Sequence, residues 1–84
     1  MNTRNTQMEV AEFCAEQGLI DLKDGEEIVE ATCEDNGDLI IMLKGRNVRY
    51  IVPLNVIRKA INVNAYWEED PYNGGEKYLI VPQD

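Results

Sequence analysis

The sequence contains no histidine, only two cysteines and no long apolar segment, and each shortage excludes a class of protein. Two cysteines alone do not supply the ligands of a typical zinc site, and the acidic residues have no oriented partner for acid–base catalysis. No apolar run approaches the roughly 18–20 residues of a membrane-spanning helix. The polar start, Met1–Asn5, lacks the apolar core of a secretory signal. We therefore expect a cytoplasmic protein with no enzymatic activity, no cofactor, no metal and no membrane partner.

The two cysteines, Cys14 and Cys33, fall in a predicted helix and a predicted strand. A single pair does not make a disulfide framework. Because the cytoplasm keeps thiols reduced and free cysteine behaves as a small apolar residue, we expect two buried, reduced thiols.

The length of 84 residues corresponds to a single domain, 1–84. A domain of this size buries only about 60–65% of the surface that its unfolded chain exposes. Burial of further surface in an oligomer would therefore add to its stability.

Acidic and basic residues are separated along the chain, and the formal net charge is −8. Residues 5–38 carry eleven acidic residues and one base, and residues 64–84 carry five acidic residues and one base. One interpretation is that the acidic and basic parts attract each other within or between subunits. The alternatives are that the basic residues contact nucleic-acid phosphates, or that the acidic part mimics nucleic acid. The segment between them, 39–63, has no acidic residue and five bases: Lys44, Arg46, Arg49, Arg58 and Lys59.

A short amphipathic helix is predicted over residues 6–17. Thr6 and Glu9 have the spacing of a capping box, in which each side chain accepts a hydrogen bond from the other residue's backbone N–H. Apolar residues recur on one face of this segment and glutamates on another. Gly18 is a typical residue for the end of a helix.

Beyond Gly18 the pattern changes to that of short strands separated by turns. Strands are predicted at 19–22, 27–34, 39–43 and 48–52, and the continuous apolar run 39–43 is predicted to be buried on both faces. Turns are predicted at 23–25 and 44–47. Asn36-Gly37 is a strong hairpin signal and predicts a type I′ turn, in which both central residues have positive φ.

The segment after Pro53 is open to two interpretations. Proline has no backbone N–H, so it must end the preceding strand or start a turn. Leu54, Ile57 and Ile61 fit one or two helical turns, whereas the β-branched residues between 56 and 63 favour a strand. After a polar loop, residues 78–81 predict a final strand that stops at Pro82.

The order of these elements resembles the Sm-like (LSm) family. Leu22-Lys23-Asp24-Gly25-Glu26-Glu27-Ile28 fits the spacing of the first Sm block, and segments 39–44 and 48–61 fit the second block in order and approximate length. The resemblance covers residues 19–63. It implies a mainly β fold with an N-terminal helix: a small, strongly bent five-stranded Sm-like barrel over 19–63, preceded by the helix 6–17 and followed by a C-terminal extension, 64–84.

Members of this family form rings, so the resemblance implies a homo-oligomeric ring of about five to seven subunits. In such a ring the fourth strand of one subunit pairs with the fifth strand of the next. These strands correspond to residues 48–52 and 56–61. The predicted oligomer interface is therefore Val48, Ile51, Ile57 and Ile61.

Family members bind uridine- or adenosine-rich RNA through two pore loops. Ile40 stands where the first loop usually has Asn, the second loop reads Pro53-Leu54-Asn55 without Arg-Gly or Lys-His, and segment 34–38 is acidic. We therefore expect RNA binding no tighter than roughly micromolar. The candidate contacts to nucleic acid or to another partner are Asn36, Asp38, Asn55, Arg46, Arg49, Arg58 and Lys59.

Two further groups of residues have alternative interpretations. The aromatic residues Tyr66, Trp67, Tyr72 and Tyr78 are suited to base stacking, or to packing across a hairpin or at a subunit interface. The carboxylates of segment 68–70 are suited to a hard cation, but the ligand spacing of a calcium loop is absent, which favours a solvated loop.

The sequence leaves two functions open. One is a ring-forming, homo-oligomeric Sm-like binding or scaffold protein, associated with RNA or with a nucleic-acid-binding protein. The other is a small acidic inhibitor that mimics nucleic-acid charge, of the type that phages and mobile elements encode. A stable ring favours the first, and a dispersed acidic face without assembly favours the second.

Overall fold

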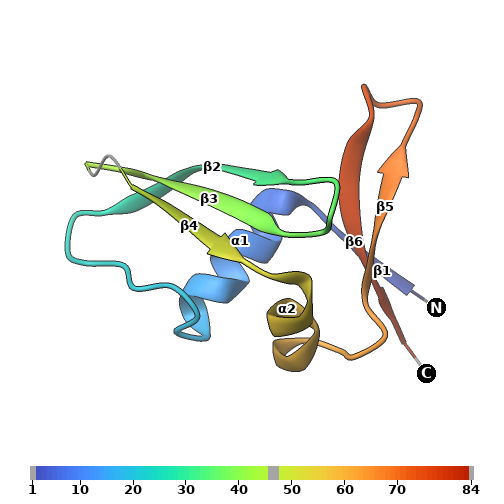
Figure 1. Ribbon diagram of the computed structural model, residues 1–84, viewed down its shortest axis with the longest axis horizontal. Helices are drawn as coiled ribbons and strands as arrows, with labels where there is room; N and C mark the ends of the chain where they lie inside the picture. Colours follow the sequence, from blue (N-terminus) through green and yellow to red (C-terminus); the bar gives the residue numbers. More distant parts are fainter. Residues whose placement is uncertain (1, 46–47, 84) are drawn as a thin grey trace.

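The computed structural model describes residues 2–45 and 48–83, which form two helices and six strands (Figure 1). The strands make two three-stranded antiparallel sheets, one with the order β2-β3-β4 and one with the order β1-β6-β5. The bounds of the elements, in chain order, are β1 (Asn2–Asn5), α1 (Gln7–Glu16), β2 (Glu27–Cys33), β3 (Leu39–Lys44), β4 (Arg49–Val52), α2 (Leu54–Ala60), β5 (Tyr66–Asp70) and β6 (Glu76–Pro82).

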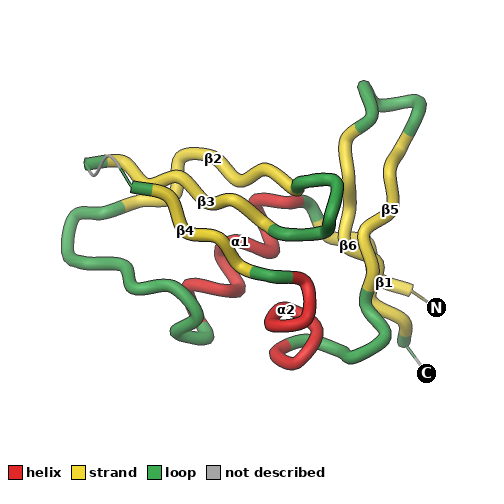
Figure 2. The backbone as a smooth tube through the Cα atoms, in the orientation of Figure 1, coloured by secondary structure: helices red, strands yellow, loops and turns green. Residues whose placement is uncertain are grey.

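The helix predicted over residues 6–17 is confirmed as α1. The capping box is present: the Glu9 N–H donates to Thr6 Oγ1 over 3.1 Å, and the Thr6 N–H donates to Glu9 Oε1 over 3.1 Å. Beyond the helix Gly18 adopts φ +75°, and the Leu19 N–H donates to the Cys14 carbonyl oxygen over 2.9 Å. Figure 2 shows α1 beside the first sheet, where it packs against β2 and β3, and it also contacts β6.

The strand predicted at residues 19–22 is wrong. Residues 19–20 form a bend that leaves the helix and residues 21–22 are irregular; the N–H of Leu19 is used to end α1. Ile20 is nevertheless buried and belongs to the core.

The hairpin predicted around Asn36-Gly37 is confirmed, but its turn type differs. Gly37 has φ +92°, and no other residue type has positive φ in the described parts of the chain. The turn is therefore not type I′, which needs positive φ at Asn36 as well. The Gly37 N–H donates to the Glu34 carbonyl oxygen over 2.9 Å, and the Glu34 N–H donates to the Asp38 carbonyl oxygen over 2.8 Å. This is the pattern of a three-residue loop that ends with a left-handed glycine.

Strand β3 is buried on one face only, which corrects the expectation of burial on both faces. Leu39, Ile41 and Leu43 are buried in the core, whereas Ile40 is half-buried and Met42 is exposed on the opposite face. The strand is central in its sheet, but helices cover just one side of it. The turn at 44–47 includes Arg46 and Asn47, which lie outside the described residues.

Residues 54–60 are helical, which confirms the first interpretation of this segment and contradicts a strand at 56–61. Pro53, with φ −63° and ψ 150°, is the N-cap of α2. The helix directs Ile57 into the core, where it is fully buried, and this burial overrides the β propensity of the neighbouring residues.

The second sheet contains strands that the Sm-like barrel does not have. Strand β6 contains the predicted final strand and pairs with both other strands of this sheet. Its pairing with β5 runs from Tyr66↔Ile80 to Asp70↔Glu76, and its pairing with β1 runs from Asn2↔Pro82 to Asn5↔Leu79. This pairing brings the two ends of the chain side by side (Figure 1). The described residues thus form a mixed α/β domain with two separate sheets and no closed five-stranded barrel.

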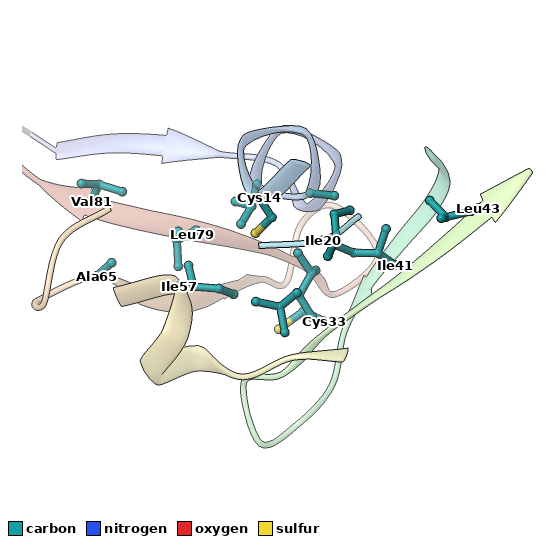
Figure 3. Packing of buried hydrophobic residues seen from close by; sticks show 13 residues of the cluster. Cys14, Ile20, Cys33, Ile41, Leu43, Ile57, Ala65, Leu79 and Val81 are labelled. Atoms are coloured by element: carbon teal, nitrogen blue, oxygen red, sulfur yellow. The ribbon is translucent and has the colours of Figure 1, made fainter. Parts of the chain in front are cut away.

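The core lies where the helices meet the two sheets. Figure 3 shows Cys14, Ile41, Ile57 and Leu79 in this interior, contributed by α1, β3, α2 and β6. The side chain of Gln7 bridges the two sheets: its Oε1 accepts from the Cys33 N–H over 2.7 Å and its Nε2 donates to the Lys77 carbonyl oxygen over 3.1 Å. In the part of the chain described here, no helix is long and apolar enough to cross a membrane.

Candidate interaction surface

The basic residues predicted to contact a partner are separated in the structure. Arg49 is exposed on β4, whereas Arg58 and Lys59 lie in the last turn of α2. Arg58 Nε donates to the Ala65 carbonyl oxygen over 2.7 Å, so this side chain holds the connection between α2 and β5. Arg46 lies outside the described residues.

Of the three polar loop candidates, Asn36 and Asp38 bond to each other in the hairpin turn. Asn36 Oδ1 accepts from the Asp38 N–H over 3.1 Å, and Asn36 Nδ2 donates to Asp38 Oδ2 over 3.2 Å, which stabilises the hairpin turn. Asn55 is exposed in the first turn of α2. Its neighbour Leu54 approaches Gly37 so closely that a Cβ there would lie 3.0 Å from Leu54 Cδ2.

The four residues of the predicted oligomer interface differ in their exposure. Val48 and Ile51 are exposed, with 47% and 62% of their surface accessible. Ile57 is wrong as an interface residue because it is fully buried in the core, and Ile61 is half-buried beside it. The error follows from placing both residues on a strand, whereas Ile57 lies in α2, which directs it into the core, and Ile61 is the C-cap of that helix.

The aromatic residues contact other parts of the same chain rather than forming one platform. Trp67 packs against the core, and its Nε1 donates to the Gly37 carbonyl oxygen over 2.9 Å. The Arg4 guanidinium lies 4.0 Å from the centre of the Tyr78 ring. Tyr72, in contrast, is 98% exposed in the loop between β5 and β6.

Among residues 2–45 and 48–83, two ion pairs connect different elements. Arg4 Nη2 lies 2.7 Å from Asp70 Oδ2, and this hydrogen bond lowers the pKa of the Asp70 carboxyl. Lys77 Nζ lies 3.2 Å from Asp35 Oδ1, and this hydrogen bond raises the pKa of Lys77. Neither of these two ion pairs contains a residue of the basic segment 39–63.

The carboxylates of segment 68–70 do not assemble a cation site. Together with Arg4, Pro71 and Tyr72 they line an open hollow of about 380 Å³, into which Arg4 already brings a positive charge. Across residues 2–45 and 48–83, no group of three or more cysteine or acidic side chains is arranged to hold a metal ion.

The most prominent feature is one that sequence reasoning missed: the outer face of the β2-β3-β4 sheet, opposite α1. The strand register places two rows of residues across the three strands, and these rows define the outer face: Glu30–Met42–Arg49 and Thr32–Ile40–Ile51. Met42 and Ile51 are exposed on this face, at 39% and 62%.

The outer face carries opposite charges at its two edges. Glu30 lies at the β2 edge and Arg49 at the β4 edge, with Met42 between them. Neither Glu30 nor Arg49 forms an ion pair with another described residue. The charge signal was visible in the sequence as an acidic and a basic segment, but only the sheet register places these two residues on either side of an apolar strip.

No family model, no curated protein and no solved structure matches this chain in comparisons with known proteins.

Proposed function

We propose that this chain is a non-enzymatic protein-interaction module that binds its partner through the outer face of the β2-β3-β4 sheet. The observation that carries the proposal is the uncovered apolar strip of Ile40, Met42 and Ile51 between oppositely charged edges. Contiguous exposed apolar surface with a polar rim is typical of an interaction site. Strand β4 also forms an edge of the sheet, where unpaired backbone groups add to its capacity to bind.

This proposal keeps the binding or scaffold role suggested by the Sm-like resemblance and changes its geometry. A ring of the Sm type needs a strand at residues 56–61 to pair with the next subunit, whereas this segment belongs to α2 (Leu54–Ala60) and its C-cap, Ile61. We therefore assign partner binding to the outer face. Under this proposal, any association with RNA would come through a bound nucleic-acid-binding partner.

Photo-crosslinking in cells tests the proposal. A photoreactive amino acid replaces Ile51 on the outer face, and the matched control replaces Val63, which is 70% exposed but lies outside this face. We expect discrete protein adducts from position 51 and none of the same mass from position 63. The absence of any adduct from position 51 would contradict the proposal.

A second candidate function, mimicry of nucleic-acid charge, is favoured by the polar side of α1. Glu9, Glu12 and Glu16 are exposed there at helical spacing, so their carboxylates form a row. None of the charged residues in the described segments is buried. If this function holds, a photoreactive amino acid at Glu12 yields adducts that added double-stranded DNA competes away, and position 51 yields none.

A further inference from the structure

The charge arrangement on the outer face indicates which partner fits it. Glu30 and Arg49 lie on the two outer strands of the sheet at the same level, with Met42 between them. We propose that the partner is a second copy of this chain, bound face to face about a two-fold axis that runs along β3. This inference rests on the proposed function, because it uses the same outer face.

The direction of the two-fold axis determines which side chains meet. Rotation about an axis along β3 places β2 of one copy over β4 of the other and leaves the position along the strands unchanged. Glu30 then lies opposite the partner subunit's Arg49, and Arg49 lies opposite the partner subunit's Glu30. An axis across the strands would place β2 over β2 and bring acidic edge against acidic edge. Charge complementarity therefore selects the axis along β3.

The same axis covers the apolar strip. Ile40 and Met42 belong to β3, so they lie near the axis and meet their own copies. Ile51 faces the partner subunit's Thr32, because these two residues end the second row. Sheets that pack face to face lie about 10 Å apart, a separation at which side chains of this size interdigitate. The contact thus removes from water the apolar side chains that the monomer exposes on the outer face.

The interface is small, which sets the conditions of the test. The two outer strands of a three-stranded sheet lie only about 10 Å apart, so the contact belongs to the transient size class. We expect a dissociation constant between roughly 10 μM and 1 mM. It should rise with ionic strength, because salt screens charge pairs at the rim of a contact.

Sedimentation equilibrium of the full chain between about 10 μM and 1 mM, with low and high salt, tests the dimer. Glu30→Arg and Arg49→Glu each place like charges opposite one another at two points, and we expect each to weaken association about tenfold or more. The double variant Glu30→Arg/Arg49→Glu restores opposite charges and should return the dissociation constant to near that of the unmodified chain.

Two matched controls remove the effect of net charge. Glu12→Arg changes the net charge as Glu30→Arg does, and Lys59→Glu changes it as Arg49→Glu does, but neither residue lies on the outer face. All substituted residues are exposed, and circular dichroism verifies that each variant is folded. We expect each control to weaken association much less than its matched variant when both are measured at the same ionic strength.

Three results would overturn the inference: a monomer at 1 mM in low salt, single variants that associate like their controls, or a double variant that is no tighter than the singles. Failure of the dimer is distinguishable from failure of the proposed function. If position 51 crosslinks only to a different protein, the outer face is an interaction site and the partner is not a second copy.

Discussion

The indole Nε1 of Trp67 donates a hydrogen bond to the carbonyl oxygen of Gly37 over 2.9 Å, and this bond joins the two sheets. Trp67 belongs to β5, and Gly37 ends the turn between β2 and β3. Leu54 of α2 packs against the same glycine. Three elements that are distant in sequence therefore meet at one turn, and the hairpin position depends on all of them.

Gly37→Ala should destabilise the fold by about 1–3 kcal/mol. The φ of +92° is unfavourable for alanine, and the added Cβ would lie 3.0 Å from Leu54 Cδ2. Gly25→Ala is the matched control, because Gly25 has φ +84° with no atom within 4 Å of an added Cβ. Urea denaturation should show a larger loss for position 37, and equal losses would mean that contact with Leu54 contributes nothing.

Trp67→Phe should lower the free energy of unfolding by about 1–3 kcal/mol, because the carbonyl of the buried Gly37 loses its donor while most of the ring packing stays. Tyr72→Phe is the control, since Tyr72 is almost fully exposed, and it should stay within about 0.5 kcal/mol. Thermal unfolding followed by circular dichroism measures both. A Trp67→Phe variant as stable as the unmodified chain would show that the bond between the sheets is dispensable.

Ile57→Ala should destabilise the monomer by about 2–5 kcal/mol, because it leaves a cavity where a fully buried side chain stood. Ile51→Ala removes a similar side chain from the exposed outer face and should change monomer stability by less than about 1 kcal/mol. Guanidinium denaturation at low micromolar concentration compares the two. Equal losses would contradict the inward orientation of Ile57.

The two thiols should make stability fall at alkaline pH. Burial raises the pKa of Cys14 from 9.0 to about 11, and burial, opposed in part by Lys77, raises the pKa of Cys33 from 9.0 to about 11. Well below pH 9 the thiols are protonated in both the folded and the unfolded chain, and their contribution to the free energy of unfolding is fully present. It is lost as the pH rises through about 11, because the unfolded chain releases these protons first.

Comparison with the double variant Cys14→Ala/Cys33→Ala isolates this effect from other titrating groups. Its free energy of unfolding should fall less between pH 8 and pH 11 than that of the unmodified chain. Labelling with a thiol reagent gives an independent measurement, because buried protonated thiols react slowly until the chain unfolds. Rapid labelling of both cysteines in the folded protein at pH 8 would contradict their burial.

Oligo-U and oligo-A should bind no more tightly than roughly micromolar at physiological salt, as the sequence predicts. Arg58 is committed to the Ala65 carbonyl, and the turn that would act as the first pore loop is acidic. Fluorescence anisotropy measures the affinity, with dependence on salt as the control for nonspecific charge. Nanomolar, sequence-selective binding would overturn this prediction.

Local signals in the sequence determined the local structure. The capping box of Thr6 and Glu9 predicted the start of α1, because these side chains satisfy backbone groups only a few residues away. Gly18 predicted its end, because glycine adopts positive φ without strain. Asn36-Gly37 likewise predicted a hairpin. The separate acidic and basic segments predicted attraction between them, within or between subunits. Arg49 has no ion-pair partner among the described residues, so attraction between subunits stays a prediction.

The tertiary structure decided what local signals left ambiguous. Residues 54–60 had both helical periodicity and β-branched side chains, and burial of Ile57 against the core selected the helix. The apolar run 39–43 is equally consistent with burial on one or on both faces, and the position of α1 on one side of the sheet left Met42 exposed. Only the register of three strands brought Glu30, Met42 and Arg49 into one row, because such placement depends on long-range pairing that no short sequence window contains.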